Sequence, residues 1–120
     1  MSSESAAALQ RYTAFVEEVL RPQLKQTLAH RDALAQEVQE YQELRERFHV
    51  RAKVLDTSLI TVDIGLNFHV EMTVPEAQKF VQNHLIHLTE KRNKWQEKAR
   101  EVSNHVNLVI ASIQQLAALQ

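Results

Sequence analysis

Histidine offers the most suggestive chemistry in the chain. His84 and His87 stand three residues apart, and Glu90 follows about one helical turn later, so one helix face could hold a metal ion. The general base of a His-Glu-x-x-His site is missing, and no other Asp or Glu is placed to complete a ligand set. We therefore predict no metal site.

Nucleophilic and phosphate-binding sites have still less support. The chain contains no cysteine, and Ser58, Ser103 and Ser112 lack the neighbours that activate a nucleophile. With one glycine in the whole sequence, a glycine-rich phosphate loop is nearly impossible. The remaining histidines are expected on helix flanks or strand surfaces: His30, His49, His69 and His105. We predict that the protein is not an enzyme and uses no cofactor.

The composition favours a few long elements. The 120 residues have room for one domain, yet one glycine and two prolines are too few for a compact fold with many turns. The net charge of -1 gives no field for nucleic acid or an anionic membrane. Neither a signal-peptide pattern nor an apolar run of about twenty residues occurs. We expect a protein of the cytoplasm and also the nucleus, without direct nucleic-acid or membrane partners.

The middle of the chain alternates strictly between apolar and polar residues. A period of two is typical of a strand with one buried face. One hairpin of this length is marginal by itself, and its apolar face has no second layer within the chain. We therefore expect other subunits to cover it. The candidate assembly residues are Ile60, Val62, Ile64, Phe68, Val70 and Met72.

Two arrangements of this segment preserve the alternation. A hairpin with the three-residue loop Gly65, Leu66 and Asn67 pairs Ile64 with Phe68. The alternative is one long, bent strand in which Gly65 forms a bulge.

The second half of the chain carries a coiled-coil seam, the stripe of apolar residues that faces a partner helix. Counting alternately by four and three from Val81 to Leu116 meets apolar residues at every step except Arg92. The start of this helix is marked by Thr73 and Glu76, which have the spacing of a capping box. Pro75 between them suits a first helical turn.

The first half has a similar seam from Leu34 to Leu55. Upstream of it the spacing lengthens to four, a stutter that locally unwinds a supercoil. Pro22 lies within the stutter, and a proline inside a helix costs about 3 kcal/mol or more. We expect a kink or local break over residues 14–22. The spacing of four joins Tyr12, Val16, Leu20, Leu24 and Leu28.

These elements predict a mainly α fold, a long antiparallel coiled-coil helical hairpin whose arms are joined by a short β-hairpin. We expect one domain over 1–120, with helices over about 5–56 and 74–119 and a β-hairpin over about 59–73. Equal rise along both arms puts Leu55 near Glu76. This register sets an acidic flank, Asp32, Glu37, Glu40 and Glu43, against a basic one, Lys91, Arg92, Lys94, Lys98 and Arg100.

Apolar residues near both chain ends exceed what one seam can use. The surplus residues are Leu9, Phe15, Val19, Leu108, Ile110 and Leu119. Such surfaces usually mark interaction sites, although Phe15 and Ile110 could instead pack on each other or on a neighbouring subunit. The candidate residues for contact with clients at this tip are Leu9, Tyr12, Phe15, Val109, Ile110, Ile113 and Leu116.

A basic run in the first helix, Arg45, Arg47, Arg51 and Lys53, alternates with Glu46 and apolar residues. Its simplest interpretation is a solvated helix flank. The other interpretation is a docking or nuclear-import patch.

Several strings, in this order, resemble an α-class prefoldin subunit: RYTAFVEEVL from Arg11 to Leu20, the run from Leu28 to Asp32, YQELR from Tyr41, VDIGLNF from Val62 and TVPEAQKF from Thr73. One departure concerns the β region. The α-class pattern has two successive hairpins, whereas this chain continues from Phe68 directly towards its second helix. The position it would fill in a prefoldin ring, α-class or β-class, stays open.

The resemblance implies a subunit of a heteromeric chaperone or co-chaperone complex. Its partners would be other prefoldin or prefoldin-like subunits, joined through the β-hairpin, and non-native clients held by the coiled-coil tips. The alternative is a coiled-coil scaffold or adaptor that acts in transcriptional co-regulation without binding clients itself.

Overall fold

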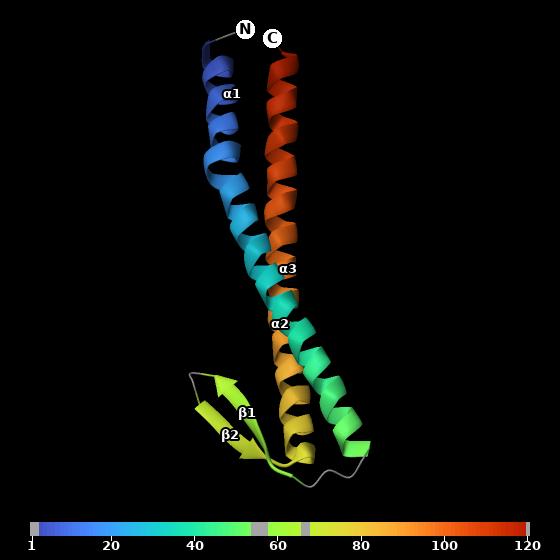
Figure 1. Ribbon diagram of the computed structural model, residues 1–120. Helices are drawn as coiled ribbons and strands as arrows, with labels where there is room; N and C mark the ends of the chain where they lie inside the picture. Colours follow the sequence, from blue (N-terminus) through green and yellow to red (C-terminus); the bar gives the residue numbers. More distant parts are fainter. Residues whose placement is uncertain (1–2, 54–57, 66–67, 120) are drawn as a thin grey trace. The chain divides into compact units, whose positions relative to one another are not determined.

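The computed structural model describes residues 3–53, 58–65 and 68–119. In chain order it contains α1 (Ser3–Phe15), the π-helical segment η1 (Val16–Leu20), α2 (Arg21–Lys53), β1 (Ile60–Gly65), β2 (Phe68–Met72) and α3 (Val74–Ala118) (Figure 1). The predicted fold class, two helical arms joined by a small antiparallel β-hairpin, is confirmed. The predicted loop residues Leu66 and Asn67, and Leu55 of the predicted seam, lie outside the described residues.

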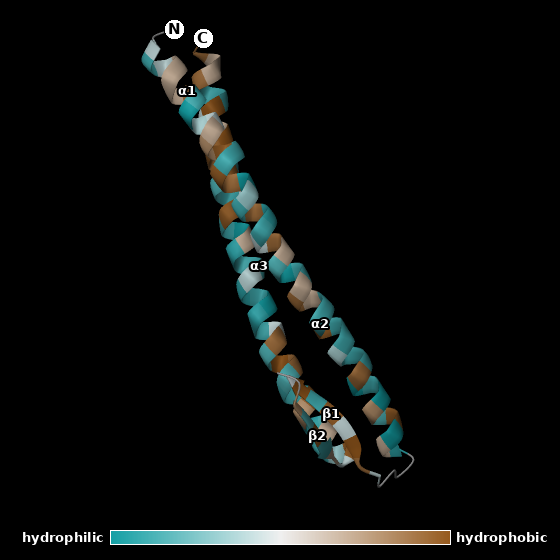
Figure 2. Ribbon diagram, turned by 60° about the vertical axis from the view of Figure 1, so that its left-hand side comes forward, coloured by the Kyte–Doolittle hydropathy of each residue, from teal (hydrophilic) through white to brown (hydrophobic). Residues whose placement is uncertain are grey.

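Two compact units can be distinguished, one made of Met1–Asp32 with Asn93–Gln120 and the other of Ala33–Arg92. Each has its own apolar cluster, and hydrophobic residues recur at intervals along the helices of both (Figure 2). The cluster of the second unit joins two helices and a strand: Val38, Phe48, Val62, Ala77, Val81, Leu85 and Leu88. The predicted heptad positions of α3 therefore form the core of this unit.

The two strands pair in antiparallel fashion, with Val62 opposite Val70. The register then shifts, so that Phe68 lies opposite Gly65 and the predicted pairing of Phe68 with Ile64 is wrong. Gly65 causes this shift, because its φ of +103° is a conformation that other residues rarely adopt. Its N–H donates a hydrogen bond of 2.9 Å to the Asp63 carboxylate. The alternative of one long, bent strand is also wrong.

The predicted capping box begins α3. The Thr73 hydroxyl accepts a hydrogen bond from the Glu76 N–H at 3.3 Å. In return the Glu76 carboxylate accepts bonds from the Thr73 N–H at 3.4 Å and from its hydroxyl at 2.9 Å. These contacts satisfy main-chain donors that a helix start would otherwise leave free.

The expected local break around Pro22 takes the form of the π-helical segment η1. The Arg21 N–H donates to the carbonyl of Val16, five residues earlier. Because proline has no N–H and its ring crowds the carbonyl four residues before it, a wider turn at this point is favoured. The wider turn also keeps Val16 and Leu20 on one side, where they are 3% and 2% exposed.

The predicted register between the helices is wrong. It would have put Tyr41 near Glu90, but the ring of Tyr41 lies 4.4 Å from that of His84. A heptad seam can match its partner after a shift along the helix, so counting equal rise from the hairpin does not fix the register. Asp32 of the predicted acidic flank forms a local ion pair, because the guanidinium of its neighbour Arg31 lies 2.7 Å from its carboxylate.

The capping box gives a first prediction. Thr73→Ala should lower the free energy of unfolding by about 1 kcal/mol, because it removes the cap of α3. Thr13→Ala is the matched control: the Thr13 hydroxyl only donates to the Leu9 carbonyl within a continuous helix. Thermal or denaturant unfolding followed by circular dichroism measures both, and equal losses would contradict a special role for Thr73.

A second prediction concerns Tyr41. Burial raises the pKa of its phenol above the ordinary 10.0, and the carboxylate of Asp63 in β1 raises it further. The neutral phenol is thus favoured in the folded state, so this contribution to stability is complete below pH 10 and is lost as the pH rises above it. In a Tyr12→Phe background, Asp63→Asn should lower the pKa of Tyr41 in an absorbance titration, while Asp32→Asn should not. An unchanged value would mean that β1 does not lie near Tyr41.

Candidate functional site

The apolar face of the β-hairpin is covered in part by the chain itself. Val62 is only 5% exposed and joins the cluster that contains Ala77 and Val81 of α3. Ile60 and Met72 pack against the same cluster. The prediction that this face has no second layer within the chain is therefore wrong for this half, because the first turns of α3 lie beside the strands (Figure 1).

The other half of this face remains open, and its three residues form the hairpin patch. Ile64 is 45% exposed, Phe68 65% and Val70 39%. Exposed apolar area costs about 25 cal/mol per Å² relative to burial. The described sheet has two strands, so each strand also has an outer edge whose main-chain groups can pair with a further strand. The patch and the edges together suit docking of a second sheet.

At the chain ends, most of the predicted tip residues are used internally. Val109, Ile110 and Ile113 of α3 pack against the cluster formed by Val16, Leu20 and Val106. Leu9 and Leu116 are half-buried. These side chains stabilise the helix pair in this unit and leave little free surface of their own.

Tyr12, Phe15 and Leu108 of this unit stay exposed, and we call them the tip patch. They are 43%, 37% and 68% exposed. The ring of Phe15 lies edge-on to His105, with 5.9 Å between the centroids. Because helices rise equally per residue, Tyr12, three residues before Phe15, lies level with Leu108, three residues after His105. The tip patch therefore has members on both helices of this unit at about the same level.

His84, one of the two histidines with metal-like spacing, packs against aromatic side chains. The His84 ring packs 4.4 Å from Tyr41 and 5.8 Å from Phe80. Among the residues that the structure describes, no three His, Asp or Glu side chains converge as metal ligands would. In the other unit His30 stacks on Trp95 at 4.5 Å. These contacts were not predicted, because their only signal in the sequence is a histidine or aromatic residue beside the seam.

None of the described helices is both long enough and apolar enough to cross a bilayer.

Comparison of the sequence with known protein families identifies the family of this chain. The sequence model of the family described as "Prefoldin subunit" matches residues 6–119, which span both helical arms and the β-hairpin. The chain belongs to the prefoldin family. The resemblance inferred from the sequence is thereby confirmed, and the hairpin patch and the tip patch belong to a prefoldin subunit.

Curated relatives of this prefoldin chain share one name. It is 28% identical over 131 residues to "Protein UXT" of Homo sapiens, covering 92% of this chain and 83% of that protein. It is 28% identical over 137 residues to "Protein UXT" of Bos taurus, covering 97% and 88%. With "Protein UXT homolog" of Dictyostelium discoideum the identity is 25% over 138 residues, covering 98% and 86%.

These coverage percentages also reveal a difference in length between this chain and the human protein. The comparison with the human protein runs over 131 aligned positions. These positions include 92% of this prefoldin chain, or about 110 of its residues. The human protein therefore has about 20 residues with no counterpart here.

The hairpin patch gives a third prediction. Phe68→Ser combined with Val70→Ser should weaken self-association of the chain more than tenfold, because each buried apolar side chain contributes about 1.5–3 kcal/mol and tenfold needs about 1.4 kcal/mol. Sedimentation velocity over a concentration series measures it. Leu59→Ser, at a residue 60% exposed just before β1, should have little effect. A wild-type chain that stays a folded monomer at micromolar concentration would show the patch to be inert.

Proposed function

We propose that this chain is a subunit of a heteromeric chaperone or co-chaperone complex, built with other prefoldin or prefoldin-like subunits. The observation that supports assembly is the hairpin patch, where Ile64, Phe68 and Val70 remain exposed beside unpaired strand edges. A hairpin from another subunit can pair with an edge and cover these side chains at once. A chain with one hairpin offers fewer pairing positions, so it occupies a β-class position or binds less tightly than a two-hairpin subunit.

The tip patch supports the second part of the proposal, contact with non-native clients. Unfolded chains expose short apolar segments that a folded protein hides. Two aromatic rings and Leu108 give a surface that can bury such a segment without requiring a particular sequence. Binding of this kind involves no bond making or breaking, so the proposed function is not enzymatic.

A coiled-coil scaffold or adaptor in transcriptional co-regulation is the second candidate. It is favoured by the inner position of Val109, Ile110 and Ile113, which leaves a smaller free apolar surface than the sequence suggested. Such an adaptor would work in the nucleus, whereas a chaperone subunit would work in the cytoplasm as well.

A fourth prediction separates the two candidates. Phe15→Ser combined with Leu108→Ser should reduce, by about half or more, the ability of the assembled complex to suppress aggregation of a denatured protein diluted from guanidinium. The reason is the loss of apolar area that a client would bury. Light scattering measures aggregation, and sedimentation verifies that the complex is still assembled.

The matched control removes similar area elsewhere. Val50→Ser combined with Leu59→Ser changes residues that are 55% and 60% exposed, and it should leave suppression intact. If the tip variant and the control suppress aggregation equally well while the complex stays assembled, clients do not use the tip patch and the adaptor function is preferred.

A further inference from the structure

A groove in the unit Ala33–Arg92 belongs to neither patch described above. It lies between α2 and α3 and has a volume of about 500 Å³. Its walls come from both helices: Arg45, Glu46, His49, Gln78, Lys79 and Gln82. We call it the basic groove.

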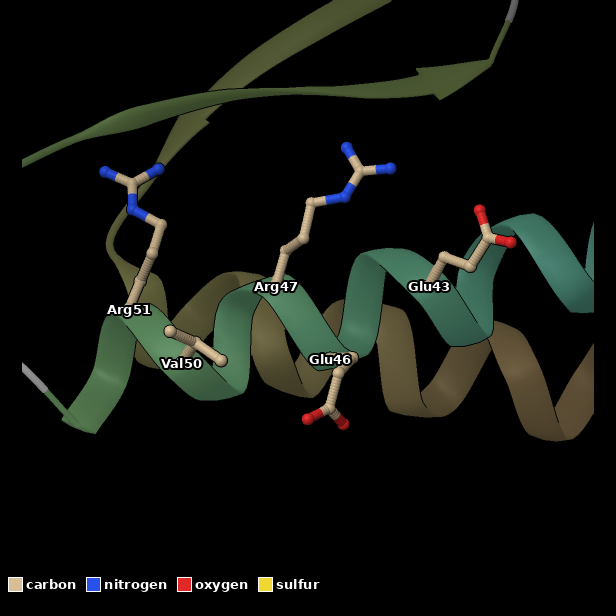
Figure 3. A pocket seen from close by; sticks show the side chains of 5 residues that line it. All are labelled: Glu43, Glu46, Arg47, Val50 and Arg51. Carbon is tan, nitrogen blue, oxygen red and sulfur yellow. The ribbon is translucent and has the colours of Figure 1, made fainter.

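The basic groove and the β-hairpin are on different sides of α2. The close view of this helix shows Arg47 and Arg51 directed towards the strands, whereas Glu46 points away from them (Figure 3). Since Glu46 is part of the groove wall, a molecule bound there would not compete with assembly through the hairpin patch.

Hydrogen-bond donors dominate the chemistry of the groove. Arg45 offers a guanidinium with five N–H donors and Lys79 an ammonium with three. Two amide side chains, Gln78 and Gln82, stand one helical turn apart and can both donate and accept. Within the described part of the chain, neither Arg45 nor Lys79 takes part in an ion pair, and Glu46 is the one carboxylate in the wall. The groove thus has a surplus of positive charge.

An apolar side chain extends the groove at one end. Ile86 follows Gln82 by four residues on α3, so it lies on the same stripe of the helix. It is 52% exposed, and the apolar clusters of the described residues do not include it. A ligand that reaches beyond Gln82 would meet this side chain.

We propose that the basic groove binds an acidic peptide segment of a partner protein, in which two carboxylates precede an apolar residue. Arg45 and Lys79 each take one carboxylate, the glutamine amides pair with the peptide main chain, and Ile86 covers the apolar side chain. The eight residue-to-residue steps from Gln78 to Ile86 rise about 12 Å, which is the length of about four residues of extended peptide. A short extended segment with two acidic residues and one apolar residue therefore matches the groove in charge and in length.

Nucleic acid is the less suitable occupant. A strand of RNA would bring its phosphates close to Glu46, and a groove this short contacts too few of them for stable binding. The net charge of -1 provides no longer-range attraction.

The test uses the full-length chain and a fluorescein-labelled peptide, Gly-Glu-Ala-Glu-Leu-Gly, in an anisotropy titration. Binding is expected, weakening as salt is added because the charges are exposed. Arg45→Glu combined with Lys79→Glu should weaken it about tenfold or more. Lys25→Glu combined with Lys94→Glu makes the same change in net charge at exposed positions outside the groove, and should weaken it far less. Arg45→Gln with Lys79→Gln repeats the test if circular dichroism shows that charge reversal disturbs the helices.

The apolar end is tested separately. Ile86→Ser should weaken binding of the leucine peptide but not of a version with alanine in place of leucine. The proposal is overturned if the wild-type chain does not bind the acidic peptide, if both charge reversals act equally, or if a peptide with lysine in place of glutamate binds as well. It is also overturned if a single-stranded RNA oligonucleotide binds more tightly at the groove. None of these outcomes bears on the hairpin patch or the tip patch, so the proposed function is tested independently.

Discussion

Two helices packed on each other can hide only the stripe that each presents to the other, and most of this protein depends on that constraint. In the unit Ala33–Arg92 the β-hairpin adds one buried side chain, Val62, to the stripe. Other large apolar residues stay in water because no further layer exists in the described chain, and Phe68, Ile86 and Leu108 are all more than half exposed. The surfaces available for binding are therefore a direct result of the architecture.

Pro22 shows how a disfavoured residue can be accommodated without loss of core packing. A regular α-helix would turn residues spaced by four gradually away from their partner, because one turn takes 3.6 residues. The π-helical segment widens the turn just before the proline, so Val16 and Leu20 both stay buried against Val106. The π-helical segment is thus the structural form that the stutter in the sequence takes.

The strands and the start of the last helix could be predicted from the sequence because their signals lie in the residues that form them. The alternation from Ile60 specified strands, and Thr73 with Glu76 specified the start of α3. The helix register could not be predicted, since a heptad seam matches its partner almost equally well after a shift of one repeat. Periodicity also shows which face of a strand is apolar without showing what covers it, so the contact of Val62 with α3 was missed. The hairpin patch and the tip patch consist of apolar residues that this packing does not cover.

Trp95 has a consequence for observing this protein in solution. It is the one tryptophan of the chain, and its ring is stacked on His30 of α2 while the ammonium of Lys98 lies 4.5 Å from its centre. Its emission therefore arises from a single place where two helices meet and depends on the contacts with the imidazole and the ammonium. Separation of the helices in the unit Met1–Asp32 with Asn93–Gln120 would remove these contacts and change the emission. The chain thus carries its own optical sensor for opening of this helix pair, with no dye attached.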